Sequence, residues 1–195
     1  MKTIYSYYRS IASSPQAEEF ACANWWKRSW EKNGWNTCML NSTHAQASSL
    51  YAKLTKKLIS VSSNINPEKS KGYEYFNVRF VRWCALHAAG GGWMCDYDVA
   101  NKNFTPDIAD KLEQENTLYV NSSGEAYIFY ATREHCESVI RKMIQDEIVA
   151  DGKPIKEAKI LGVTSDISSI LPMLHHAKPT KNKSKSEVME KVCHG

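Results

Sequence analysis

Residues 82–98 read RWCALHAAGGGWMCDYD, and this stretch decides which fold we expect. The apolar residues before the three glycines predict the last turns of a helix over 73–89, because glycine commonly follows the end of a helix. The apolar residues 93–95 predict a short buried strand. Asp96 and Asp98 follow that strand directly. The stretch therefore predicts a helix, a turn and a strand that delivers two acidic side chains to one edge of a sheet.

The chain before this stretch predicts a β-α-β unit. Residues 4–8 are β-branched and aromatic, which is typical of a strand. A helix is expected to begin at Pro15, directly after a capping serine, and to stop at Gly34. Residues 35–40 predict a second strand, and 45–58 predict another helix. Such an alternation is the start of a parallel sheet.

The chain after the stretch continues the alternation and then changes character. Residues 118–120 and 126–130 flank an Asn-Ser-Ser-Gly turn signal and predict a hairpin. A capped amphipathic pattern predicts a helix over 132–150, and 160–163 is expected to be a last strand. Lysine, serine, threonine and asparagine dominate 178–195, which predicts a basic tail or a loop that only a ligand orders.

Length and composition limit the class of protein. At 195 residues and 22.1 kDa the chain is long enough for one domain with a substantial core. Its 43% hydrophobic and 24% charged residues are those of a globular protein and exclude a disordered chain. The longest uncharged apolar stretch, 83–95, is shorter than the ~20 residues that span a membrane. We therefore expect one α/β domain over 1–177, with a mainly parallel central sheet flanked by helices, before the tail.

Two features of the sequence indicate a cytoplasmic protein. Residues 1–9 lack the apolar segment of a secretory signal peptide. The six cysteines are evenly spread and form no Cys-x-x-Cys pair. We therefore expect reduced, mostly buried thiols and no structural zinc.

The two aspartates are the strongest chemical signal in the sequence. Residues two apart on an extended chain project from the same face, so Asp96 and Asp98 are expected to lie side by side. Two such anions repel each other unless a cation lies between them. Hard ions such as Mg²⁺ and Mn²⁺ prefer oxygen ligands and complete their shell with water and substrate phosphates. Because the carboxyl ends of strands form the ligand edge of an α/β sheet, the pair predicts a metal and phosphate site rather than two solvated turn residues.

The same stretch carries a resemblance to a known family. The run from Arg82 through Ala85-Leu86 and Gly-Gly to Asp96-x-Asp98 is similar to the signature of DXD-motif glycosyltransferases. That group includes yeast-type mannosyltransferases and the glucosylating domains of clostridial toxins. The opening strand and tryptophan-bearing helix are similar too, so the resemblance covers about 1–105 of the chain. It implies a GT-A fold, a single Rossmann-like domain that binds a nucleotide sugar through a divalent metal.

The resemblance also implies roles for the matched residues. Asp98 resembles the direct metal ligand, and Asp96 the residue that contacts metal-bound phosphate, ribose or the donor sugar. An arginine of the preceding helix would reach the donor. This sequence has three glycines and one residue more between Arg82 and Asp96 than the family pattern, and Arg79 stands where the family usually has an aspartate. The donor-binding arginine is therefore Arg82 or Arg79.

Several aromatic residues are expected either near the donor or in the core. By the resemblance, the nucleotide base would be held beside the first strand, where Tyr5, Tyr7 or Tyr8 could stack on it. Trp93, beside the glycines, would lie against the donor, or it belongs to the core. The tryptophans of the first helix are expected in the core.

Residues late in the chain complete the expected site. GT-A enzymes often add a histidine from near the C-terminus to the metal shell, and His175 or His176 is the candidate; the alternative is a pair of surface histidines. Lys178 and Lys181 would clamp the diphosphate, or they belong to a solvated tail. An inverting enzyme needs a base for the acceptor hydroxyl, for which Asp166 is the candidate, although it also suits a helix cap.

These expectations define a metal-dependent glycosyltransferase. It would use Mn²⁺ or Mg²⁺ to transfer a sugar from a UDP- or GDP-linked donor to a hydroxyl of a saccharide acceptor. One alternative is a nucleotide-sugar-binding module without turnover. Another is a haloacid-dehalogenase-like phosphatase with Asp96 as nucleophile, but that fold carries the motif on its first strand. A nucleic-acid-binding module is the weakest alternative, because the net charge is only +4 and no aromatic-basic motif occurs.

Overall fold

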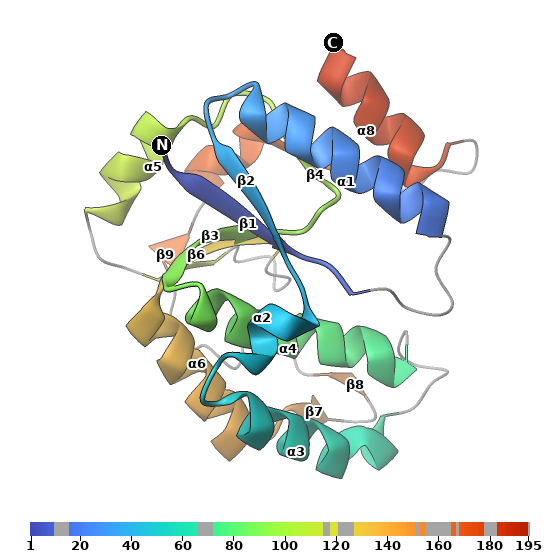
Figure 1. Ribbon diagram of the computed structural model, residues 1–195, viewed down its shortest axis with the longest axis vertical. Helices are drawn as coiled ribbons and strands as arrows, with labels where there is room; N and C mark the ends of the chain where they lie inside the picture. The colour runs from blue at the N-terminus through green and yellow to red at the C-terminus, as the bar shows by residue number, and fades with distance from the viewer. Residues whose placement is uncertain are drawn as a thin grey trace.

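The structure is a computed structural model, and it has an α/β fold with a six-stranded sheet between helices (Figure 1). The α/β class agrees with the sequence prediction. The residues that the structure describes are 1–9, 16–65, 72–114, 118–120, 127–150, 153–154, 165–166, 168–177 and 183–194.

The chain opens with the predicted β-α-β unit. β1 (Thr3–Tyr7) and β2 (Asn36–Leu40) pair in parallel, and α1 (Gln16–Glu31) connects them. The helix packs on the sheet through one buried side, which includes Trp26 and Trp30. These two tryptophans were expected in the core, and the structure confirms it.

The single helix predicted over 45–58 is wrong, because the chain forms two helices there. α2 (Ser42–Gln46) is short, and α3 (Tyr51–Val61) begins after a turn. The hydroxyl oxygen of Ser48 accepts a hydrogen bond from the backbone N–H of Leu50 at 3.3 Å. This local bond competes with the helical pattern and holds the turn between the two helices.

The helix and strand predicted around the glycines are both present. A short 3-10 helix (Ser62–Asn64) ends the α3 region, and α4 (Gly72–Ala88) then leads to β3 (Gly91–Cys95). Gly90, Gly91 and Gly92 all have positive φ angles, of 95°, 88° and 130°. L-residues with a side chain rarely adopt such angles, so glycine is what allows the reversal from helix to strand.

The central sheet is mixed, and three of its five strand pairings are parallel, in line with the mainly parallel sheet that was predicted. The other strands are β5 (Tyr119–Val120), β6 (Ile128–Thr132) and β9 (Ser165–Asp166), and the strand order is β2-β1-β3-β6-β5-β9. β1 pairs in parallel with β2 and β3, and β5 in parallel with β9. β6 runs antiparallel to both of its neighbours, β3 and β5, so the predicted antiparallel pair of strands is confirmed. The turn expected between them lies outside the described residues.

Shorter elements lie around this sheet. β4 (Val99–Asn101) pairs antiparallel with β10 (Leu174–His176), and β7 (Val149–Ala150) pairs antiparallel with β8 (Lys153–Pro154). α5 (Pro106–Glu113) begins with a proline, which fits the first turn of a helix. A second 3-10 helix spans Ser168–Met173.

Two helices differ from the sequence predictions. α6 (Arg133–Gln145) ends earlier than the helix expected over 132–150. α8 (Lys185–His194) lies within the segment 178–195 that was expected to be a tail or loop, so that prediction is wrong for these ten residues. The lysines and serines in and before this segment made its amphipathic pattern hard to recognise in the sequence. The strand expected over 160–163 lies outside the described residues.

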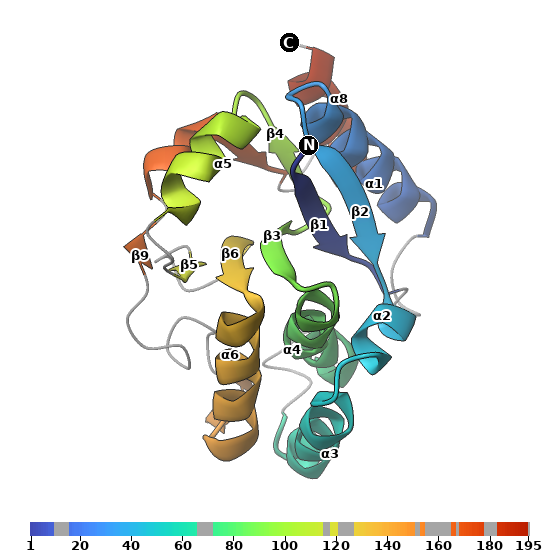
Figure 2. The ribbon, with the colours of Figure 1, turned by 60° about the vertical axis from the view of Figure 1, so that its left-hand side comes forward.

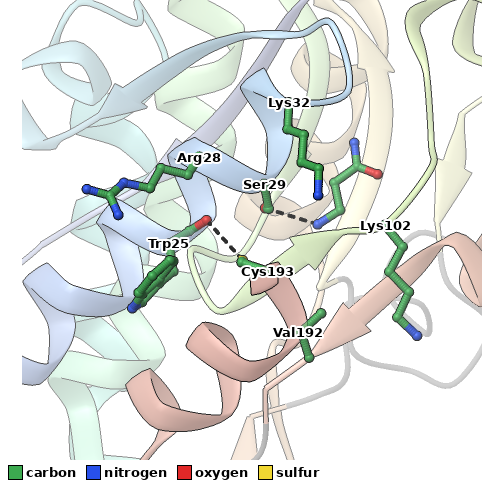
Figure 3. Close-up of a pocket in the computed structure, with 8 residues that line it drawn as sticks. Trp25, Arg28, Ser29, Lys32, Lys102, Val192 and Cys193 are labelled. Carbon is green, nitrogen blue, oxygen red and sulfur yellow. Dashed lines mark hydrogen bonds between the residues drawn. The ribbon is translucent and has the colours of Figure 1, made fainter. Parts of the chain in front are cut away.

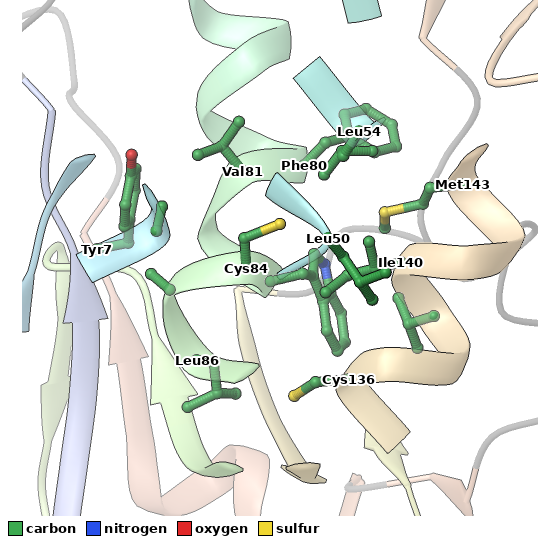
Figure 4. Packing of buried hydrophobic residues seen from close by; sticks show 14 of the residues in the cluster. Tyr7, Leu50, Leu54, Phe80, Val81, Cys84, Leu86, Cys136, Ile140 and Met143 are labelled. Atoms are coloured by element: carbon green, nitrogen blue, oxygen red, sulfur yellow. The ribbon is translucent and has the colours of Figure 1, made fainter. Parts of the chain in front are cut away.

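The helices form two layers, one on each face of the sheet (Figures 1 and 2). α1, α5 and α8 cover one face, and α2, α3, α4 and α6 cover the other. Figure 4 shows the core of the second layer, where Phe80 and Cys84 of α4 lie among Leu50, Leu54 and Ile140. Burial of apolar side chains on both faces is the main force that holds such a three-layer arrangement together.

All six cysteines are free, and burial keeps several of their thiols protonated. Burial raises the pKa of Cys22 to about 11 and that of Cys84 to about 12. These thiols therefore pack as small apolar groups. None of the helices in the described part of the chain combines the length and apolar character that crossing a bilayer requires.

Alanine substitutions at two adjacent glycines are expected to differ strongly in their effect on stability. A Cβ at Gly91 would lie 2.6 Å from the backbone nitrogen of Arg133 and 2.7 Å from the carbonyl oxygen of Ala131, whereas a Cβ at Gly90 would meet nothing within 4 Å. Both substitutions strain a positive φ, at a cost of about 1–2 kcal/mol. Gly91→Ala also pushes β3 away from β6, so we expect it to lower the free energy of unfolding by about 2 kcal/mol more than Gly90→Ala. Urea unfolding of both variants measures this difference, and equal losses would contradict it.

Candidate metal centre

The order of the first three strands creates a ligand edge. The chain crosses from β1 to β2 over the face covered by α1, and from β2 to β3 over the face covered by α2, α3 and α4 (Figures 1 and 2). The connections therefore diverge between β1 and β3. In open α/β sheets the crevice beyond the carboxyl ends of such strands is where ligands bind. Tyr8 follows β1 at this edge, and Asp96 follows β3.

Two tryptophans of α1 fix the loop that carries the aspartates. Trp26 donates a hydrogen bond from its indole nitrogen to the Sγ of Cys95 at 3.1 Å, and Trp30 donates one to the carbonyl oxygen of Val99 at 2.9 Å. These contacts lie immediately before and after residues 96–98. The buried indole N–H groups thus satisfy their hydrogen bonds and hold the loop at both ends.

Backbone hydrogen bonds bring a third segment to the aspartates. The N–H of Val99 donates to the carbonyl oxygen of Asp96 at 3.0 Å, which closes the loop. The N–H of Ala177 donates to the carbonyl oxygen of Asp98 at 2.8 Å, and His176 of β10 pairs with Val99 of β4. The histidine is therefore brought next to Asp98 by strand pairing across a long sequence separation.

Asp96, Asp98 and His176 form a compact cluster of metal-ligating side chains. One ligand atom from each of the three lies within 4.8 Å of the others. The Nε2 of His176 is 3.4 Å from Oδ1 of Asp98, and its ring stacks on Tyr127 with centroids 4.9 Å apart. Asp98 is buried, with 5% of its surface exposed, whereas the Asp96 side chain is 38% exposed. The cluster is therefore closed on one side and open to a ligand on the other.

Of the two histidines proposed from the sequence, the structure brings His176 to the cluster. His175 precedes it in β10 and is not part of the group. Successive side chains of a strand point to opposite faces, so only one of the two can face the aspartates.

Two cations lie against the aspartates. The Nη1 of Arg82 in α4 donates to Oδ1 of Asp96 at 2.7 Å, so the structure places Arg82 at the candidate site. Arg79 lies one helical turn earlier on α4 and is half-buried. Lys185 of α8 donates from Nζ to Oδ2 of Asp98 at 2.5 Å, a contact that the sequence analysis missed. The one signal for it was its position in the lysine-rich final segment.

These contacts shift the proton affinities of the cluster. Burial raises the pKa of Asp98, but the hydrogen bond with His176 and the charge of Lys185 outweigh it and hold the pKa below its ordinary value. The same hydrogen bond raises the pKa of His176. Because a metal binds only the neutral imidazole, an ion that coordinates His176 competes with protons for its ring nitrogen.

The acidic first turn of α1 lies beside the cluster, and the sequence analysis did not include it in the site. Glu19, in the first turn of α1, accepts hydrogen bonds from the hydroxyls of Tyr8 at 2.9 Å and Tyr97 at 3.4 Å. Glu18 accepts the backbone N–H of Lys185 at 2.7 Å. Burial and the charge of Glu19 raise the pKa of Tyr97, so its hydroxyl stays protonated. This network ties α1 and α8 to the ends of β1 and β3.

Three aromatic residues expected at the donor lie elsewhere. Tyr7 is buried in the core under α4 (Figure 4), so its expected role in stacking on a base is wrong. Trp93 is also buried, and its indole nitrogen donates to Glu113 at 2.8 Å, which makes it a core residue. Tyr5 lines a separate pocket of about 630 Å³ beside the glycines of β3. All three lie within the paired part of a strand rather than beyond its last pairing, so they do not reach the ligand edge.

The remaining residues proposed from the sequence are less closely defined. Asp166 lies in β9, level with Val120, and the structure describes its backbone only. β9 is parallel to β5 and three strands away from β3, roughly 14 Å at the usual strand spacing. Lys178 and Lys181 lie outside the described residues.

The donor set of the cluster suits a divalent metal ion. Two carboxylates and one imidazole provide oxygen and nitrogen ligands within reach of one ion. A histidine ligand favours Mn²⁺ over Mg²⁺, because Mg²⁺ takes oxygen ligands almost exclusively. The residues therefore fit the ion that the sequence pattern predicts. Fold and cluster together define an α/β protein with a candidate metal centre at the carboxyl edge of its sheet.

Comparisons with protein-family models, with curated proteins and with solved structures gave no match to this chain. The functional argument therefore depends on the geometry of the site and on the sequence motif.

Proposed function

We propose that the chain is a metal-dependent glycosyltransferase of GT-A type. It binds a nucleotide-diphosphate sugar at the carboxyl edge of β1 and β3 and transfers the sugar to a hydroxyl of a saccharide acceptor. The observation that carries this proposal is the meeting of Asp96, Asp98 and His176 beyond the end of β3. His176 lies 78 residues after Asp98 in the sequence. A chance Asp-x-Asp pair would not be expected to lie beside a histidine from so distant a segment.

The sheet topology supports binding of a nucleotide at this edge. The crevice between β1 and β3 is where doubly wound folds hold nucleotide phosphates. Tyr8 and Tyr97 lie beside it, with ring centroids 5.9 Å apart and an interplanar angle of 76°. Of the three tyrosines considered for the base, Tyr8 has a position that supports this role.

Each residue of the cluster has a role in the proposed reaction. Asp98 and His176 would hold the metal from the buried side, and Asp96 would hold it from the exposed side. The bound ion would neutralise the negative charge that builds on the departing nucleoside diphosphate. Arg82 orients the carboxylate of Asp96 through the 2.7 Å hydrogen bond and adds positive charge next to the diphosphate. Asp166 remains the proposed base for an inverting reaction.

One alternative shares the binding site and differs in turnover. A chain that only binds nucleotide sugars would use the same cluster and lack the acceptor base. Nothing in the described site favours the phosphatase alternative. Asp96 would be its nucleophile, but β3 is the third strand of the chain, and Arg82 already holds one oxygen of that carboxylate.

Calorimetry with UDP- and GDP-linked sugars tests the proposed function. With Mn²⁺ present, at least one donor should bind, and the same titration in EDTA should give at least tenfold weaker binding. Release of the nucleoside diphosphate on addition of saccharide acceptors then separates a transferase from a binding module. Failure of every donor to bind in the presence of Mn²⁺ would contradict the proposal.

A further inference from the structure

A second pocket lies away from the candidate metal centre, between α1, α8 and the turn after β4 (Figure 3). Its volume is about 450 Å³, within the range of pockets that hold small molecules. Lys185, at the metal centre, and Cys193, at this pocket, are eight residues apart on α8, roughly 12 Å along the helix. The two sites are thus separate.

The lining of this pocket is strongly cationic. Arg28 comes from α1, Lys32 from the turn after α1 and Lys102 from the turn after β4, and none of the described residues that line the pocket is acidic. Within the described part of the chain, none of these three side chains forms an ion pair with a carboxylate. Three uncompensated positive charges around one concave surface favour an anionic ligand.

The positive charges reach the interior of the pocket. Burial raises the pKa of the Cys193 thiol, and the charges of Lys32 and Arg28 act in the opposite direction on it. The charge of Lys102 likewise contributes to lowering the pKa of the nearby His175. The charges of the lining cations therefore act on the Cys193 thiol inside the pocket and on the imidazole of His175.

The pocket also has an apolar surface that is held in place. In Figure 3, Trp25 and Arg28 lie on one side, Lys32 and Lys102 on the other, and Cys193 between them. The guanidinium of Arg28 is 5.1 Å from the centre of the Trp25 ring, and the Cys193 thiol donates to the Trp25 carbonyl at 3.6 Å. The thiol thus connects α8 with the backbone of α1, and the guanidinium of Arg28 packs on the indole within α1.

We propose that this pocket binds a small organic phosphate, with its ring or other apolar part against Trp25 and Val192 and its phosphate between Lys32 and Lys102. A phosphate dianion matches two cations, and a flat ring matches an indole face and an apolar side chain. The proposal does not depend on the glycosyltransferase function, because none of these residues belongs to the metal centre.

Phenyl phosphate, phenol and inorganic phosphate test the proposal by calorimetry in EDTA, which keeps metals out of the other site. Phenyl phosphate should bind at least tenfold more tightly than either of the other two. The double variant Lys32→Gln/Lys102→Gln should weaken its binding at least tenfold, and Lys27→Gln should leave it unchanged. Lys27 is a matched control, since it is an exposed lysine of α1 outside the pocket and lies 3.8 Å from Glu31.

Nuclear magnetic resonance locates the bound probe. Phenyl phosphate should shift the indole N–H signal of Trp25 and the amide signal of Cys193 and leave that of Asp98 unchanged. Absence of binding, equal affinity in the double variant, or equal affinity for inorganic phosphate would each overturn the proposal.

Discussion

The affinity of the Asp98→Asn variant for Mn²⁺ is expected to be lower than that of the unchanged chain by a factor of about 100. The variant should also lose metal-dependent binding of the donor. Asp98 is the most buried member of the cluster and lies against His176. Water can therefore replace its carboxylate less easily than the other two ligands. Asparagine keeps the size and one oxygen but removes the charge that attracts a divalent ion. Electron paramagnetic resonance of free Mn²⁺ measures the affinity directly.

Two further variants show whether the loss is specific. His176→Gln should weaken Mn²⁺ binding about tenfold, because it removes a neutral ligand and leaves both carboxylates. Asp146→Asn, a change at an exposed aspartate after α6, should have no effect on the metal. Thermal melts in EDTA establish that each variant is folded. Unchanged Mn²⁺ affinity in a folded Asp98→Asn variant would refute the metal centre.

Local patterns predicted the parts of the fold whose determinants are close in sequence. The helix, glycine triplet and strand of residues 72–95 are encoded by neighbouring residues, since glycine alone allows three successive positive φ angles there. The side-by-side placement of Asp96 and Asp98 follows from strand geometry in the same way. The split between α2 and α3 was missed because a side-chain hydrogen bond from Ser48 decides it, and periodicity contains no such information.

The parts of the site that sequence reasoning missed depend on long-range packing. Lys185 contacts Asp98 across 87 positions of sequence, and this contact exists because α8 packs on α1. The hydrophobic pattern of this lysine-rich segment indicated neither that a helix forms there nor where it packs. Glu19 lies in the first turn of α1, and its contacts with Tyr8 and Tyr97 need the ends of three elements to meet. The choice of His176 over His175 similarly required the register of β10 against β4.

The Lys185→Met variant is expected to bind Mn²⁺ about tenfold more tightly than the unchanged chain, an effect opposite to that of Asp98→Asn. The Nζ of Lys185 is 2.5 Å from Oδ2 of Asp98, so the ammonium group occupies the position from which a cation would bind that carboxylate. A metal ion must displace it. Removing the competing charge removes that cost, and methionine keeps most of the apolar length of the side chain.

The same substitution should destabilise the chain when no metal is present. The Asp98 side chain is 8% exposed and loses its closest cation, although the 36% exposure of Lys185 limits the value of the pair. We expect a loss of about 1–2 kcal/mol in the free energy of unfolding in EDTA. Saturating Mn²⁺ should then raise the melting temperature of Lys185→Met by more than that of the unchanged chain, because the ion replaces the missing positive charge. Lys191→Met, at an exposed lysine of the same helix, should change neither quantity.

The double variant Asp98→Asn/Lys185→Met decides whether the two residues act through each other. If Lys185 opposes the metal only by occupying Asp98, its removal should bring no gain in Mn²⁺ affinity once the carboxylate is gone, and the two effects should be strongly non-additive. A tenfold gain that persisted in the double variant would mean that Lys185 repels the ion through the general field of the site. In that case its contact with Asp98 would be a structural ion pair between α8 and the end of β3, and metal binding would leave α8 in place.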